Sequence, residues 1–190
     1  FSIAISNVFA PRVNKIVATS DDDNELTGLM IKIGRIQFIV LSVVAIGFLF
    51  CGHEFCCLWA GYDYSESYLI AVALILPSTI PLIQNVGISV LTARNKHKFR
   101  SIAYFFIALG NAAISIPLCQ SMEGLGCAIG TGISMVIGNG IIINLYYKKL
   151  GIDIREFWKS ILSLSMGLIP MLVMGVFLIM LKNTYSWMDL

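Results

Sequence analysis

Four stretches of the chain contain no charged residue, and each is at least 22 residues long. They cover residues 67–93, 101–122, 124–147 and 160–181. An α-helix rises about 1.5 Å per residue, so about 20 apolar residues cross the hydrocarbon core of a bilayer. The pattern therefore predicts several membrane-spanning helices.

With two apolar stretches nearer the N-terminus, the pattern predicts five complete spans and one truncated span. The truncated span covers residues 1–16, and the complete spans cover about 36–58, 68–91, 102–119, 125–146 and 161–181. Short links make neighbouring spans antiparallel, which predicts an all-α membrane protein, a multi-pass helical bundle. Because the chain begins inside an apolar segment, we expect an internal or C-terminal piece of a larger protein.

Composition supports a bilayer as the solvent. Apolar residues make up 57% of the chain and charged residues 13%, against about 25% charged residues in an average soluble domain. A core built from 190 residues cannot hide that much apolar surface from water.

The basic residues predict an orientation. Twelve of the thirteen fall in three loops, at 12–35, 94–100 and 148–159, and only Lys182 lies on the other side. By the positive-inside rule these three loops are cytoplasmic. The acidic cluster of Asp21, Asp22, Asp23 and Glu25 is then most simply a solvated cytoplasmic loop.

Proline and polar residues inside the spans are the candidate functional positions. Prolines remove a backbone donor and kink helices, and the kink candidates are Pro77, Pro81 and Pro117. The candidates for a substrate path are small hydroxyl and amide side chains: Ser78, Gln84, Asn85, Ser89, Asn111 and Ser115. The alternatives are ordinary packing kinks and hydrogen bonds between helices.

Small residues recur at every fourth position of the span predicted over 125–146, at Gly126, Gly130, Ser134 and Gly138. This spacing favours close packing of two helices, and a sliding surface is the compatible alternative.

Covalent chemistry has little support in the sequence. The loop between the second and third spans holds His53 and Glu66, and we expect no ionisable group deep inside a complete span. His53 and His97 are isolated, which argues against a metal site or a nucleophilic triad, so we expect no cofactor and no catalytic residue. The five cysteines indicate apolar filling of the helices, with an outward disulfide as the alternative.

Three stretches resemble a known family. Residues 9–13 (FAPRV) resemble the end of a span in bacterial polysaccharide flippases. Residues 91–98 (LTARNKHK) resemble their L-x-A-x-G-K-x-K loop, with Asn95 in the usual glycine place. Asn111, Pro117 and residues 124–131 resemble their N…P…G-x-x-G-A-A-I-A-T stretch. The chain is similar to O-antigen (Wzx-type) flippases of the multidrug/oligosaccharidyl-lipid/polysaccharide exporter superfamily.

The resemblance implies one lobe of a MATE-like bundle that works by alternating access. It implies a membrane transporter, not an enzyme, that moves an undecaprenyl-diphosphate-linked oligosaccharide across the bacterial inner membrane. It also implies contact with membrane lipids, a polysaccharide polymerase and a chain-length regulator, and none with nucleic acid. A multidrug or lipid II exporter of the same superfamily is the alternative, and a membrane-embedded polymerase or acyltransferase is the alternative of another class.

The basic residues of one loop suggest how this function could use charge. Four basic residues between the third and fourth spans could attract the substrate diphosphate before entry: Arg94, Lys96, Lys98 and Arg100. Plain positive-inside topology is the alternative.

Overall fold

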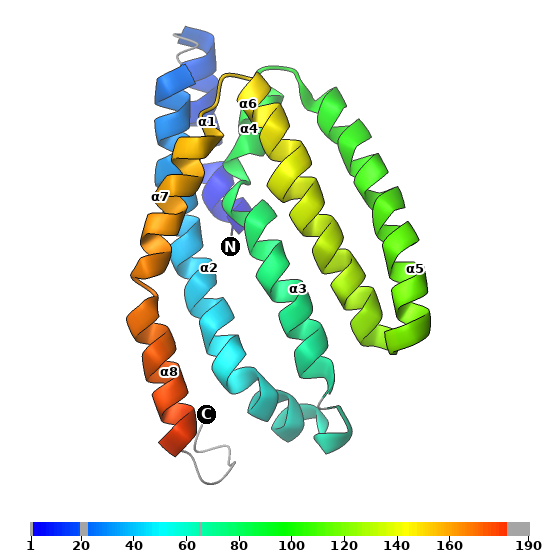
Figure 1. Cartoon of the computed structure of the whole chain (residues 1–190). Coiled ribbons are helices and arrows are strands. Elements are labelled where there is room, and N and C mark those ends of the chain that lie inside the picture. Colours follow the sequence, from blue (N-terminus) through cyan, green and yellow to red (C-terminus); the bar gives the residue numbers. More distant parts are fainter. Residues whose placement is uncertain (1, 20–22, 65, 182–190) are drawn as a thin grey trace.

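The protein is a curved row of roughly aligned helices, in which some neighbours run antiparallel and others run parallel (Figure 1). A computed structural model describes residues 2–19, 23–64 and 66–181. In chain order its helices are α1 (Ser2–Thr19), α2 (Asp23–Ala60), the short η1 (Tyr62–Tyr64), α3 (Glu66–Ile83), α4 (Val86–Ala93), α5 (His97–Met135), the π-helix η2 (Val136–Ile143), α6 (Asn144–Lys149), α7 (Ile154–Met166) and α8 (Ile169–Leu181). Asp21, Asp22 and Lys182 lie outside the described residues.

The longest helix, α5, is a hairpin. Met122 (φ −131°) and Glu123 (φ 49°) leave helical geometry, and the chain reverses there (Figure 1), within the predicted outer loop. The two arms touch through the small residues of the fifth predicted span. A Cβ on Gly130 would lie 2.5 Å from Ser115 Oγ, and one on Gly138 would lie 2.7 Å from Ile107 Cδ1. The predicted packing role of this pattern is therefore confirmed.

Helices that are neighbours in the row are not always neighbours in the chain (Figure 1). The second arm of α5 lies against α3, where a Cβ on Gly132 would lie 2.9 Å from the Ala73 carbonyl oxygen. Helix α3 packs against α2, and α2 also contacts α7 and α8 (Figure 1).

Two predicted spans are interrupted. The span expected over 68–91 breaks at Gln84 and Asn85, where α3 ends and α4 begins. The span expected over 161–181 breaks between α7 and α8, because Pro170 has no amide hydrogen and its ring would clash with the carbonyl of Met166, the last residue of α7. The π-helix η2 within the span expected over 125–146 was not predicted.

The packed core lies at the end of the row that carries the basic loops. Buried side chains from α1, α2, α4, α6 and α7 meet there, among them Val13, Leu26, Leu91, Tyr147 and Phe157. Farther along, only 6% of the most apolar window of α3, and of the segment Lys98–Lys149, is buried inside the protein. These exposed apolar surfaces suit lipid.

The predicted fold class is confirmed. Segments long and apolar enough to cross a membrane cover Asp23–Ala60, Glu66–Ile83, Lys98–Lys149 and Ile154–Phe177, and the third is the folded α5–η2–α6 hairpin. At the far end of α2, the loop expected from His53 to Glu66 begins later, because His53 and Glu54 belong to this helix, and Glu54 is only 8% exposed.

Two glycines of α2 provide a matched test of the packing between α2 and α7. A Cβ on Gly34 would lie 2.6 Å from Cε2 of the fully buried Phe157, whereas a Cβ on Gly28 would meet nothing within 4 Å. In the full-length protein, Gly34→Ala should lower the unfolding free energy by about 1–3 kcal/mol through overpacking. Gly28→Ala should raise it by up to about 1 kcal/mol through helix propensity. Unfolding curves in detergent measure both, and equal effects of the two substitutions would contradict this packing.

Candidate functional site

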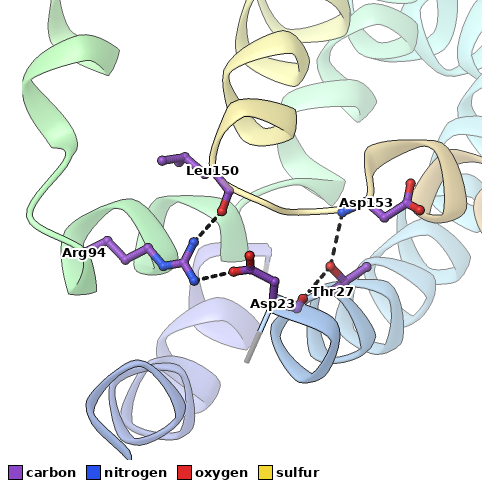
Figure 2. A network of polar contacts seen from close by, with 5 residues as sticks. All are labelled: Asp23, Thr27, Arg94, Leu150 and Asp153. Carbon is purple, nitrogen blue, oxygen red and sulfur yellow. Dashed lines mark hydrogen bonds and ion pairs between the residues drawn. The ribbon is translucent and has the colours of Figure 1, made fainter. Parts of the chain in front are cut away.

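A polar network joins the helix ends at the basic end of the row (Figure 2). Arg94, after α4, donates from Nη2 to Asp23 Oδ1 at 2.6 Å and from Nη1 to the Leu150 carbonyl oxygen at 2.5 Å. The Thr27 hydroxyl donates to the Asp23 carbonyl oxygen at 2.7 Å and accepts from the Asp153 amide at 3.2 Å. The network thus ties the start of α2 to the ends of α4 and α6 and the start of α7.

Helix caps place these groups. Asn95 (φ 53°) ends α4, and the Lys96 amide returns to the Leu91 carbonyl oxygen. Gly151 (φ 86°) ends α6 in the same way, since the Ile152 amide returns to the Tyr147 carbonyl oxygen. Both are left-handed caps of the Schellman type, which explains why a glycine would suit position 95.

A side chain at position 151 would also collide with Asp23. An added Cβ there would run into the Asp23 carboxylate. The start of α7 is capped separately, because Asp153 Oδ1 accepts from the Arg155 amide at 3.0 Å and the Glu156 amide at 3.1 Å. Glycine at 151 and aspartate at 153 therefore let the α6–α7 loop close over α2.

The network overturns the expectation of a solvated acidic loop and reduces the number of basic residues that are available to steer a headgroup. Asp23 is not part of a simply solvated loop, because it pairs with Arg94 in the first turn of α2. The Arg94 side chain is only 11% exposed and uses both terminal nitrogens within the protein. Among the basic residues predicted to steer a headgroup, Lys96 and Lys98 are exposed, while Arg100 lies 4.9 Å from the centre of the Tyr104 ring.

A buried amide junction occupies the break between α3 and α4. Asn85 Nδ2 donates to Ser2 Oγ of α1 at 2.7 Å, and Gln84 Nε2 donates to Asn144 Oδ1 of α6 at 2.9 Å. Gln37 of α2 donates to the Ser2 carbonyl oxygen at 3.0 Å. Two candidates for the substrate path thus hold four helices together at one point.

The remaining path candidates lie elsewhere. Ser115 Oγ donates to Asn111 Oδ1 at 2.8 Å, and Thr131 Oγ1 reaches the same oxygen at 3.4 Å from the other arm of α5. Ser78 donates to the Ile75 carbonyl oxygen of its own helix at 2.8 Å, and Ser89 is half-buried on α4. The structure therefore makes two polar sites from the six candidates.

The three prolines predicted as kink candidates lie inside continuous helices. Helix α3 continues through Pro77 and Pro81 and ends at Ile83, and Pro117 lies inside the first arm of α5. Pro77 packs against α5, because a Cβ on Gly132 would lie 3.0 Å from its Cγ.

Sequence reasoning missed two partners of the amide junction. Gln37 is 1% exposed and Ser2 is 5% exposed, and neither was chosen as a path candidate. The lone amide of Gln37 within an apolar run was an available signal, since amides in such runs need partners. Among the described residues, no group of His, Cys, Asp or Glu could hold a metal ion.

A comparison with protein families identifies the family to which the chain belongs. The chain matches the family described as "Lipid II flippase MurJ" over residues 1–189. It belongs to the lipid II flippase MurJ family. No curated protein and no solved structure matches the chain.

Membership of the MurJ family confirms the coarser expectations. It places the chain in the flippase superfamily named from the sequence, and it supports a membrane transporter for lipid-linked substrates, not an enzyme. The family match does not extend to the narrower resemblance to O-antigen flippases.

The ion pair of this MurJ-family chain can be measured by a double-mutant cycle. Arg94→Ala and Asp23→Ala in the full-length protein should each lower the unfolding free energy, with a coupling of about 1–2 kcal/mol. This value lies between those of an exposed ion pair and a buried charged hydrogen bond. Thermal unfolding in detergent measures it, with exposed Lys98→Ala as the control. Additive effects would show that the two side chains do not interact.

Proposed function

We propose that the protein is part of a flippase that carries a polyprenyl-diphosphate-linked glycan from the cytoplasmic to the outer leaflet of the bacterial inner membrane. The leading substrate is a lipid II-type cell-wall precursor. The family match over residues 1–189 carries this proposal. On this view the basic loops face the cytoplasm, as the positive-inside rule favours.

The amide junction supports a role in the conformational cycle. Gln84 and Asn85 lie where α3 gives way to α4, and their partners belong to α1 and α6. Interrupted helices near the middle of a bundle are typical of transporters. If α3 moves relative to α6 during transport, these hydrogen bonds must exchange for others, and a glycan hydroxyl is a suitable replacement partner.

An O-antigen repeat unit is the second candidate substrate. It is supported by the resemblance of residues 91–98 to a loop of O-antigen flippases, in which glycine stands at the place of Asn95. Asn95 adopts φ 53°, a conformation that glycine adopts readily, so the backbone here suits the glycine of that motif. Both candidates share the polyprenyl diphosphate and differ in the glycan, so one assay design serves for both.

Depletion of the full gene separates the two substrates. If the protein moves lipid II, depletion should trap lipid II in the cytoplasmic leaflet and cause lysis, because wall synthesis stops. Leaflet-specific labelling of the lipid-linked precursor measures the trapping, and complementation with the intact gene is the control. Loss of surface O-antigen without lysis would assign the O-antigen unit instead. Unchanged leaflet distribution of both lipids would overturn the flippase proposal.

The exposed basic residues supply a kinetic test of headgroup steering. Lys96→Gln with Lys98→Gln should raise the apparent KM for the lipid-linked substrate several-fold, leave kcat unchanged and weaken the salt dependence of transport. Flipping in proteoliposomes at two ionic strengths measures this, with exposed Lys15→Gln as the matched control. Identical KM values for wild type and double variant would leave positive-inside topology as the explanation of these lysines.

A further inference from the structure

A cavity of about 490 Å³ lies between the η2–α6 segment and α7. Its lining is mostly apolar, with charged residues toward the basic end of the row. The lining residues are Gly140, Ile141, Asn144, Leu145, Lys148, Asp153, Ile154, Arg155 and Trp158. A cavity of this size accommodates a ligand or part of a lipid.

Packing on either side of the cavity holds its walls apart. Helix α7 is anchored on α2 by the fully buried Phe157 facing Gly34. The opposite wall is held by Asn144, which donates to the Gly140 carbonyl oxygen at 2.8 Å and accepts from Gln84. Because Gly140 belongs to the π-helix, the cavity borders a type of segment that is frequent at functional sites.

The cavity is open along one side, where its apolar wall is exposed. Ile141 is 53% exposed and Leu145 is 58% exposed, and both lie on the apolar wall. Half-buried Trp158 lies at the same site, and its indole suits the boundary between lipid chains and headgroups. An occupant with an alkyl chain could therefore enter from the membrane.

The charges at the basic end favour an anion. Lys148 and Arg155 are exposed and line the cavity, and within the described part of the chain neither makes an ion pair. The nearby carboxylate of Asp153 is engaged in capping α7 through two backbone amides. Lys149, at the end of α6, and Lys159, in α7, add two positive charges at this end of the row, against one negative charge from Glu156 of α7.

We propose that this cavity binds a membrane glycerophospholipid with an anionic headgroup. Its phosphodiester would lie between Lys148 and Arg155, and an acyl chain would follow Ile141 and Leu145. Basic pockets between transmembrane helices on the cytoplasmic side are suited to anionic headgroups. The open apolar wall favours a lipid already present in the leaflet over a free phosphate. The proposal does not depend on which glycan is transported.

The test uses the full-length protein in detergent and phosphatidylglycerol with a photoreactive acyl chain. Cross-linking should map to residues 140–158, and a phosphatidylcholine analogue with the same chains should label this region much less. Lys148→Gln with Arg155→Gln should weaken phosphatidylglycerol binding about 25-fold, about fivefold for each charge. The control is Lys32→Gln with Arg35→Gln, which removes two exposed positive charges from α2 outside the cavity and should retain wild-type labelling.

A second variant tests the cavity without changing its charge. A Cβ on Gly140 would meet only Val136 of its own helix segment, at 3.9 Å, so Gly140→Leu should fill the cavity while the protein folds. It should abolish labelling at residues 140–158, and an unfolding curve verifies folding. The proposal is overturned by equal labelling with both lipids, by full labelling of Gly140→Leu, or by displacement with inorganic diphosphate as effective as with phosphatidylglycerol. The last result would assign the site to the substrate diphosphate.

Discussion

The packed end of the row depends on the contacts of Arg94, which follows α4 and reaches two other helix ends. Its guanidinium joins the Asp23 carboxylate at the start of α2 to the Leu150 carbonyl oxygen at the end of α6. Both contacts are electrostatically favourable, because helix N-termini attract carboxylates and helix C-termini attract cations. Directly below, the buried core joins α1, α2, α4, α6 and α7, so the network closes the end of the bundle that is packed best.

The rest of the row relies on other interactions. Lipid tails are as apolar as the helix surfaces, so burial from water does not drive helices together inside a bilayer. Close contacts at Gly130, Gly132 and Gly138 supply packing there instead. The hydrogen bonds of Gln84 and Asn85 lie at the packed end, beside Ile83 and Val86 of the core, and supply specificity. A row that is held firmly at one end and by few polar contacts elsewhere is free to change shape at its other end.

The candidate site shows which properties of the amides can be predicted from residue type alone and which cannot. Mid-span amides were expected either to line a substrate path or to bond between helices. The structure shows bonds between helices at Gln84 and Asn85, and it adds Ser2 and Gln37 as partners. The two roles are compatible, since groups that bond in one conformation can meet substrate in another. No periodicity could have paired Asn85 with Ser2, because the pairing crosses 83 residues of sequence.

The uncharged apolar runs by themselves determined an all-helical membrane protein, and the resemblance of residues 9–13, 91–98 and 124–131 to known flippases indicated the superfamily. These properties are local, because the length of an uncharged run sets where a helix can cross a bilayer. Only the tertiary structure decided where those helices break, that Asp23 and Arg94 pair, and that the Glu54 side chain near the end of α2 is buried. It also formed the cavity between η2, α6 and α7. These features arise from contacts between residues that are distant along the chain, and a pattern of apolar and polar positions does not encode which distant partners meet.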